Sequence, residues 1–366
     1  MDNKQRVLAS LSHERVGQIP FDIFEGWMWP GITASMVREL HAKDYEDLLD
    51  KLGVCCRWVT PMYRGPTLPL GAKDRIASPH TTHSLNAAIW GLEPGLREHG
   101  LGTAGHPLAQ AQSRQDILQH AWPSPDWFDY AELRENARKH KNHFVIAGGF
   151  SPLFYLLSDL CGMEKTLMDL LLNPELIEAL VGRIVEFYKD YFARIAKMCK
   201  GTVDAIAFGD DFSGQKAILM SPEIWRRYFK RAWAELFGIA KENGYKVFFH
   251  SCGSVFEIIS DLIEIGLDVL YPIQPKAKLM DIATLKDRFG DSLSFYGGVD
   301  VQELLPFGKP EEIKEEVRRM QWLFSDSGGY ILSTSHVIMD EIPVENALAL
   351  YEQVRGGRVW CSKQMT

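Results

Sequence analysis

The chain has 366 residues, of which 46% are hydrophobic and 24% charged, so it can bury a large core and is not globally disordered. Its net charge of −8 at pH 7 argues against nucleic acid or an anionic membrane as a partner, because both select basic surfaces. No apolar run approaches the roughly 18 to 20 residues that span a bilayer, and residues 1–6 lack the apolar segment of a secretion signal. We therefore expect a cytoplasmic protein that binds no nucleic acid and no membrane.

The predicted elements begin with an N-terminal helical extension, which is followed by eight short strands. The apolar runs of these strands are nearly continuous, as is typical of parallel strands buried on both faces. Helices with clear start and stop signals separate the later strands, and one of them begins at Ser221-Pro222-Glu223 and ends at Asn243-Gly244. The predicted strands lie at residues 20–24, 53–59, 143–147, 205–208, 246–250, 268–271, 293–296 and 330–333.

This alternation of strands and helices predicts a parallel sheet with right-handed crossover connections. Eight strands favour a distorted (β/α)8 barrel of the TIM type. An open doubly wound sheet would need a glycine-rich phosphate loop after the first strand, whereas residues 24–29 are largely aromatic. We predict one barrel domain over residues 1–366. Residues 60–127 are rich in Gly, Pro and His, interrupt the alternation, and are predicted to be a lid-like insertion over one mouth of the barrel.

Polar and metal-binding side chains follow most of the predicted strands, at the carboxyl ends where barrel enzymes carry their active sites. We predict that these side chains surround one pocket. The predicted set comprises catalytic Asp210 and Asp211, substrate-binding Glu25, Trp27, Gln215, Gln274 and Asp300, and metal-binding His250, Cys252 and His336.

His250 and Cys252 form the sharpest motif in the sequence. At a spacing of two residues, both side chains leave an extended segment on the same side. An imidazole and a thiolate are zinc-type ligands, and a catalytic zinc usually has about three protein ligands, so His336 at the end of another strand is the predicted third. The alternative is that His250 bonds a carbonyl and Cys252 packs as a small hydrophobic residue. The six cysteines of the chain show no disulfide spacing.

The acidic and aromatic candidates each have a structural alternative. Asp210 and Asp211 could bind substrate, act as a base or orient a metal-bound group, but one of them could instead cap a helix. Asp300 has the same alternative. Glu25 and Trp27 follow the first strand. Aromatic rings at that position would line a pocket for a carbon-rich substrate, or they would simply pack in the core.

Several segments resemble the uroporphyrinogen decarboxylase superfamily over essentially the whole chain. The matching segments are residues 6–11, 19–22, 248–254, 261–268 and 297–300. The resemblance implies one of two known activities. The true decarboxylases use no metal and hold a tetrapyrrole with an arginine-rich loop, and that arginine motif is absent after the first strand here. The corrinoid-dependent methyltransferases carry a His-x-Cys zinc pair, which His250 and Cys252 match.

The methyltransferase arm implies zinc on this chain and methylcobalamin or another corrinoid as co-substrate on a separate corrinoid protein, with a small molecule as methyl donor or acceptor. In the coenzyme M methyltransferases the third zinc ligand is a late cysteine, whereas Ser335-His336 stands in that region here, which leaves the methyl acceptor open. Two alternatives remain: a decarboxylase or other lyase acting on a carboxylated ring, and a non-catalytic barrel that binds a tetrapyrrole or corrinoid. The sequence also leaves a homodimer open.

Overall fold

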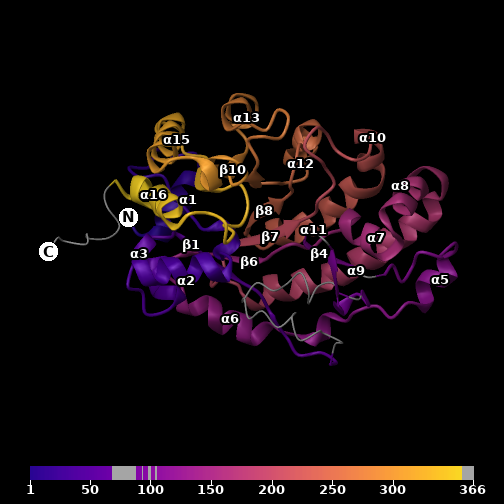
Figure 1. Ribbon diagram of the computed structural model, residues 1–366. Coiled ribbons are helices and arrows are strands. Elements are labelled where there is room, and N and C mark those ends of the chain that lie inside the picture. The colour runs from indigo at the N-terminus through magenta and orange to yellow at the C-terminus, as the bar shows by residue number, and fades with distance from the viewer. Residues whose placement is uncertain (68–87, 93, 98–99, 104, 357–366) are drawn as a thin grey trace.

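The computed structural model describes residues 1–67, 88–92, 94–97, 100–103 and 105–356 (Figure 1). Its centre is a seven-stranded parallel sheet in the order β1-β6-β7-β8-β9-β10-β11. All seven strands match predicted ones within a few residues, and their side chains are almost all buried. The strands are β1 (Cys56–Val59), β6 (Phe144–Gly148), β7 (Ala205–Gly209), β8 (Lys246–His250), β9 (Val269–Ile273), β10 (Ser294–Val299) and β11 (Tyr330–Thr334).

The segment around Phe21 lies between the two outer strands of this sheet and makes it a distorted barrel. Phe21 forms a parallel bridge with Leu332 of β11, and its carbonyl accepts a hydrogen bond from the Cys55 N–H, next to β1. The predicted first strand is therefore present only as this short bridge. Pro20 offers no N–H for a ladder, and Glu25 takes a left-handed conformation (φ +46°), which ends the extended run.

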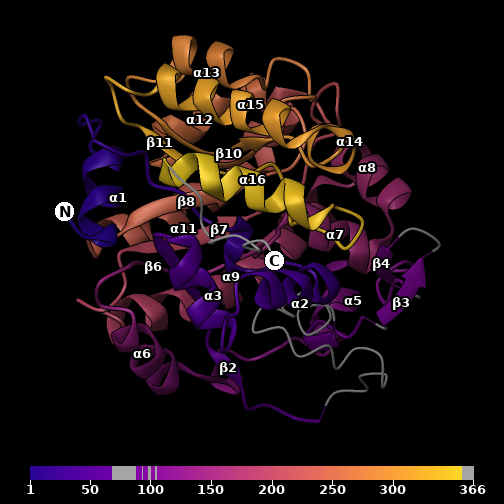
Figure 2. The ribbon, with the colours of Figure 1, turned by 60° about the vertical axis from the view of Figure 1, so that its left-hand side comes forward.

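Helices surround the sheet on its outside (Figures 1 and 2). No helix among the described residues is both long enough and apolar enough to cross a membrane. The helices are α1 (Asn3–Leu11), α2 (Pro30–Glu39), α3 (Tyr45–Leu52), α5 (Arg114–Gln119), α6 (Tyr130–Lys139), α7 (Phe154–Cys161), α8 (Met163–Leu172), α9 (Pro174–Met198), α10 (Pro222–Trp225), α11 (Arg231–Glu242), α12 (Ile259–Glu264), α13 (Ile282–Phe289), α14 (Leu304–Phe307), α15 (Pro310–Leu323) and α16 (Val344–Arg355).

The predicted helix signals act locally as expected. The Ser221 hydroxyl accepts the Ile224 N–H at the start of α10, and Pro222 occupies the first turn. The sequence periodicity did not predict that a π-helical turn at Arg226–Lys230 separates α10 from α11. Two apolar layers hold the barrel together. One layer packs helices on the sheet, and the other fills the barrel interior with rings such as Trp58, Phe248 and Tyr271.

The predicted insertion is described in part. Its two ends meet where β2 (Met62–Tyr63) pairs antiparallel with β5 (Phe128–Asp129), and β3 (Pro94–Arg97) pairs with β4 (Gly100–Thr103). Trp90 packs its ring against Phe187 of α9. The predicted lid also includes residues 68–87, 93, 98–99 and 104, which lie outside the described residues.

Candidate active site

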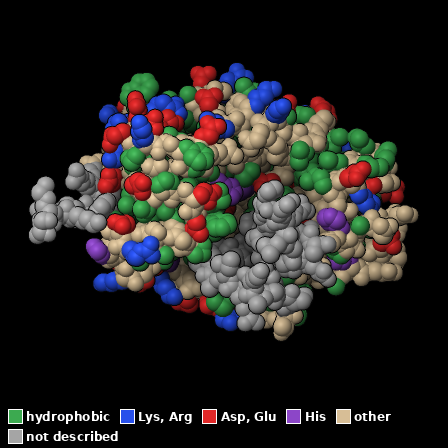
Figure 3. All heavy atoms as spheres, in the orientation of Figure 1, with side chains coloured by type: hydrophobic (Ala, Val, Ile, Leu, Met, Phe, Trp, Pro, Cys, Tyr) green, Lys and Arg blue, Asp and Glu red, His purple; other side chains and the backbone are tan. Residues whose placement is uncertain are grey.

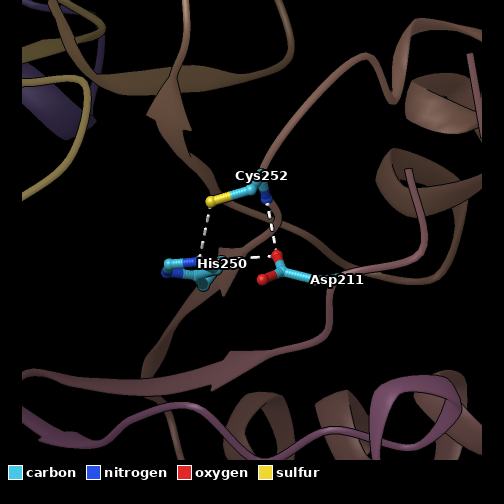
Figure 4. Close-up of side chains that lie close together, drawn as sticks. All are labelled: Asp211, His250 and Cys252. Atoms are coloured by element: carbon cyan, nitrogen blue, oxygen red, sulfur yellow. Dashed lines mark hydrogen bonds and ion pairs between the residues drawn. The ribbon is translucent and has the colours of Figure 1, made fainter. Parts of the chain in front are cut away.

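His250 and Cys252 lie together at the carboxyl end of β8, as their spacing predicts (Figure 4). The Cys252 Sγ atom is 3.5 Å from His250 Nε2. His250 is buried, and Cys252 is partly exposed. Three rings surround the imidazole, with centroid distances of 5.9 Å to Phe24, 5.4 Å to Phe150 and 5.3 Å to Tyr271. Aromatic rings thus enclose the His250 imidazole, whereas the Cys252 side remains partly accessible.

Asp211 is the third side chain of this cluster. Its Oδ1 atom is 3.6 Å from His250 Nε2 and accepts a hydrogen bond of 2.8 Å from the Cys252 N–H. The register explains this proximity: Gly209 of β7 pairs with His250 of β8, so the residues two places further on lie side by side. Among the described residues, Asp211, His250 and Cys252 are the one group of three whose potential ligand atoms lie within 4.8 Å of one another.

His336, the predicted third ligand, is not part of that group, and Asp211 stands beside the pair in its place as a potential third ligand. Two strands separate β11, which precedes His336, from β8, whereas β7 is directly beside β8. The His336 ring stacks on Phe24 with a centroid distance of 5.0 Å and an interplanar angle of 20°. Ending a strand at the same mouth was too weak a criterion to place it beside the His-x-Cys pair.

The three donor atoms fit a tetrahedral zinc ion. With zinc bonds of about 2.0 Å to nitrogen or oxygen and 2.3 Å to sulfur, tetrahedral angles place the nitrogen about 3.5 Å from the sulfur and about 3.3 Å from the oxygen. The separations in the structure are 3.5 Å for His250 Nε2 to Cys252 Sγ and 3.6 Å for His250 Nε2 to Asp211 Oδ1. Three protein ligands also leave one position open, which is typical of catalytic zinc.

Glu25 orients the imidazole from the opposite side. Its Oε1 atom is 3.2 Å from His250 Nδ1 and accepts a hydrogen bond of 3.3 Å from the Tyr271 hydroxyl. A proton on Nδ1 that is donated to this carboxylate leaves the Nε2 lone pair directed at Asp211 and Cys252. Metal-binding histidines usually have such a carboxylate partner. We predicted Glu25 as a substrate-binding residue; the structure places it behind the imidazole.

The charges in this cluster favour a cation. Burial lowers the pKa of His250, but Cys252, Glu25 and Asp211 outweigh this and raise it well above the usual range. Burial raises the pKa of the Cys252 thiol, with Asp211 adding to the effect and His250 opposing it. No described Lys or Arg forms an ion pair with Asp211, His250 or Cys252. A proton on the imidazole or a bound metal ion would supply the compensating positive charge.

Two of the predicted acids act as helix caps. Asp210 is fully buried, and its carboxylate accepts the N–H groups of Leu153, Phe154 and Tyr155 at the start of α7. Burial raises the pKa of Asp210 to about 7, against the lowering effect of these three bonds. Asp300 similarly accepts three N–H groups, from residues 302–304 before and at the start of α14. The carboxylates of both residues therefore bind backbone N–H groups at helix starts and do not act as pocket-lining groups.

The remaining candidates lie around the His-x-Cys loop or in the core. Gln274 Oε1 accepts the Gly253 N–H at 2.9 Å and a weaker bond of 3.4 Å from Gln215 Nε2. Gln274 therefore supports the loop that follows Cys252, and Gln215 bonds Gln274. Trp27 is half-buried and packs against the apolar interior of the barrel. The structure thus joins Asp211, His250, Cys252 and Glu25 directly, and Gln274 bonds the residue that follows Cys252.

Sequence reasoning missed the aromatic residues that complete the site, Phe24, Phe150 and Tyr271. Tyr271 is the last residue of the predicted strand at residues 268–271, and its inward direction could have been read from strand alternation once β8 and β9 were aligned. Asp22 was placed in a family-like segment but was not singled out as a site candidate; it is buried, and its carboxylate accepts hydrogen bonds from Trp58 Nε1 at 2.8 Å and from the Tyr296 hydroxyl at 3.1 Å.

The model of the family described as uroporphyrinogen decarboxylase (URO-D) matches residues 131–357, which is more than half of the chain. The chain belongs to the uroporphyrinogen decarboxylase family. This family match confirms the resemblance inferred from the sequence segments.

A curated uroporphyrinogen decarboxylase from Pseudomonas fluorescens (strain Pf0-1) is 24% identical over 214 residues, which are 58% of this chain. The chain spans about half the length of that relative, 54%. Among solved structures, a methyltransferase from Methanosarcina mazei aligns with a TM-score of 0.64 and 21% identity, covering 97% of this chain and 99% of that one. This structural likeness confirms the barrel fold.

Proposed function

We propose that this member of the uroporphyrinogen decarboxylase family is a zinc-dependent methyltransferase that moves a methyl group between a small molecule and a corrinoid. The observation that carries the proposal is the cluster of Asp211, His250 and Cys252, whose donor separations fit a zinc ion with one open position. A zinc ion held there would act as a Lewis acid that lowers the pKa of a thiol, phenol or water at the open position.

In this proposal, different residues of the chain bind the ion, orient the imidazole and exclude water. Asp211, His250 and Cys252 hold the ion, and Glu25 fixes the imidazole so that Nε2 stays available. The Phe24 and Phe150 rings pack against His250 and limit the access of water to it. Burial of the site by aromatic rings suits an apolar methyl-bearing group better than a polycarboxylate, which would need cationic partners.

In the proposed reaction, the bond between methyl carbon and an oxygen, sulfur or nitrogen atom of the small molecule breaks, and the reduced cobalt of the corrinoid forms the new bond to that carbon. The heteroatom then takes up a proton. In the reverse direction the heteroatom loses a proton and receives the methyl group from methylcobalamin. Free thiols and phenols have pKa values of about 8.5 and 10 and are mostly protonated at pH 7, so a pKa-lowering ion is needed.

We further propose that the corrinoid arrives on a separate protein, which docks on the exposed apolar surface of α8. Met168, Leu171 and Leu172 of this helix are 51%, 69% and 67% exposed, and hydrophobic surface gathers over α7 and α8 in Figure 3. α8 packs beside α7, and Tyr155 of α7 packs on Phe150, which in turn packs on His250. Large exposed apolar patches often mark protein contacts.

The experiment that tests the proposed activity is demethylation of methylcobalamin by the purified protein with a panel of thiols, phenols and amines, with and without a zinc chelator. We expect activity that depends on zinc and is lost in Cys252→Ala. Release of carbon dioxide from a porphyrinogen by the metal-free protein would instead establish the decarboxylase alternative. Absorbance of a tightly bound tetrapyrrole or corrinoid without turnover would establish the non-catalytic alternative.

The docking surface is tested with Leu171→Glu and Leu172→Glu. We expect both variants to lose methyl transfer to or from a protein-bound corrinoid while they keep activity with free methylcobalamin. Trp322→Glu is the matched control, because Trp322 is also an exposed large hydrophobic residue, at 77%, but lies on α15. Equal losses with both forms of the corrinoid would contradict docking at α8.

A further inference from the structure

The turn that carries Glu25 has an unfavourable backbone conformation. Glu25 has φ +46° and the next residue, Gly26, has φ +74°, so two successive residues lie in the left-handed region. Glycine adopts this region freely, but a residue with a side chain does so only where its surroundings enforce it. Within the turn, the Gly26 N–H donates to the Ile23 carbonyl at 2.8 Å. This bond closes the turn, but it does not fix the turn to the barrel.

Two tyrosine hydroxyls fix the turn to the rest of the barrel. The Tyr296 hydroxyl of β10 accepts the Glu25 N–H at 3.3 Å, and the Tyr45 hydroxyl of α3 donates to the Gly26 carbonyl at 2.9 Å. The bonded groups are the first N–H and the last carbonyl of the two left-handed residues. A strand and a helix therefore hold both ends of the strained stretch.

A buried polar network holds the Tyr296 hydroxyl in turn. Tyr296 is fully buried, and its hydroxyl oxygen lies 3.1 Å from Asp22 Oδ2 and 3.0 Å from the Ile23 carbonyl oxygen, so its single proton has an acceptor in either direction. Asp22 is also buried, and it accepts the Trp58 indole N–H at 2.8 Å and the Ile23 N–H at 2.9 Å. Buried networks whose members are bonded specify one arrangement of their side chains. The proposed reaction uses neither Asp22 nor Tyr296 as a chemical group, so positioning is the role that their contacts support.

The position of the Glu25 carboxylate depends on this turn, because the carboxylate is attached to its left-handed backbone. Glu25 Oε1 lies 3.2 Å from His250 Nδ1, and a change of the turn toward an extended conformation would move the carboxylate away from that nitrogen. We propose that Tyr296 and Tyr45 are positioning residues for His250, which hold the Glu25 turn in the conformation that orients the imidazole. The consequence for zinc rests on the proposed function, whereas the orientation of the imidazole does not require a metal ion.

The first test is a double-mutant cycle on zinc affinity, measured in the full-length protein by competition with a chromophoric chelator. Tyr296→Phe and Tyr45→Phe each remove one hydroxyl and leave the three potential ligands unchanged. We expect each to weaken zinc binding about three- to tenfold, which corresponds to one net hydrogen bond. In the Glu25→Ala background the same substitutions should change the affinity less than about twofold, because the carboxylate that they position is absent. A purely structural effect would persist in that background.

The second test needs no metal. In the metal-free protein with isotope-labelled histidine, nuclear magnetic resonance follows the exchange of the His250 Nδ1 proton with water, and His250→Gln identifies the signal. The hydrogen bond to Glu25 slows this exchange. We expect the exchange to be about threefold faster or more in Tyr296→Phe and Tyr45→Phe, and fastest in Glu25→Ala.

Tyr245→Phe is the matched control, because the Tyr245 hydroxyl is buried and donates to the Ala196 carbonyl of α9 at 2.8 Å, outside the turn and its network. It should change neither zinc affinity nor proton exchange. Tyr45 is only half-buried, so Tyr45→Phe tests the proposal even where Tyr296→Phe folds poorly.

Values like those of the control in both tyrosine variants, or an undiminished loss of zinc affinity in the Glu25→Ala background, would overturn the positioning role. Faster exchange in a protein that binds no zinc would keep the positioning role and reject the proposed function. Zinc-dependent methyl transfer with unchanged exchange would do the reverse, so the two proposals fail separately.

Discussion

The role assigned to Glu25 makes a quantitative prediction for metal affinity. Its carboxylate accepts hydrogen bonds from His250 Nδ1 at 3.2 Å and from the Tyr271 hydroxyl at 3.3 Å. Glu25 is not one of the three potential metal ligands. Loss of such a partner typically weakens metal binding 10- to 100-fold, which is about 1.4 to 2.7 kcal/mol. We expect Glu25→Gln near the lower limit, because the amide oxygen can still accept a bond, and Glu25→Ala near the upper limit.

The backbone at Glu25 separates this effect from a general loss of stability. Glu25 has φ +46°, which costs a side-chain-bearing residue roughly 1 kcal/mol that glycine does not incur. Glu25→Gly and Glu25→Ala should therefore weaken zinc binding equally, while Glu25→Gly unfolds with a free energy about 1 kcal/mol higher than Glu25→Ala.

Zinc affinity is measured by competition with a chromophoric chelator, and the free energy of unfolding by urea titration of the metal-free protein. Glu39→Gln, at an exposed position on α2, is the control and should change neither quantity. A change in zinc affinity of less than twofold in Glu25→Ala would refute the orienting role. Equal unfolding free energies for Glu25→Ala and Glu25→Gly would refute the argument from backbone strain.

Four further outcomes follow from the same contacts. Asp211→Ala should remove most bound zinc and His336→Ala should retain it, as measured by elemental analysis; the opposite result would restore His336 as the ligand. Asp210→Asn should lower the free energy of unfolding by about 2 kcal/mol, since one amide oxygen cannot accept three N–H groups, yet keep zinc bound. Removing zinc with a chelator should abolish transfer and leave the far-UV circular dichroism unchanged. Burial raises the pKa of Asp22 from 3.8 to about 6, so the folded state binds its proton more tightly and this stabilisation is lost as the pH rises through that range. Between pH 7 and pH 4 the wild type should therefore gain about 2.4 kcal/mol of unfolding free energy relative to Asp22→Asn, and a constant difference in urea titrations would contradict it.

The strands could be predicted because parallel strands that are buried on both faces leave continuous apolar runs in the sequence. The predicted ends of these strands were accurate enough to place Asp211 and His250 at the same mouth. The first strand was less predictable, because its single bridge at Phe21 depends on contacts with Leu332 and Cys55, which are remote in sequence.

The ligand set could be predicted only in part, because it depends on strand order and register. The His250–Cys252 pair is local and follows from a spacing of two. The choice between Asp211 and His336 needed the order of the strands, in which β7 and not β11 is beside β8. The position of Glu25 depends on a left-handed turn at a residue that rarely adopts one, and no sequence rule anticipates this.

The most direct test of the account is a zinc-edge anomalous difference map from crystals of the protein grown with zinc. We expect one peak that lies about 2.0 to 2.3 Å from Asp211 Oδ1, His250 Nε2 and Cys252 Sγ, with Glu25 still bonded to His250 Nδ1. A peak coordinated by His336, or no peak among these three side chains at saturating zinc, would contradict it.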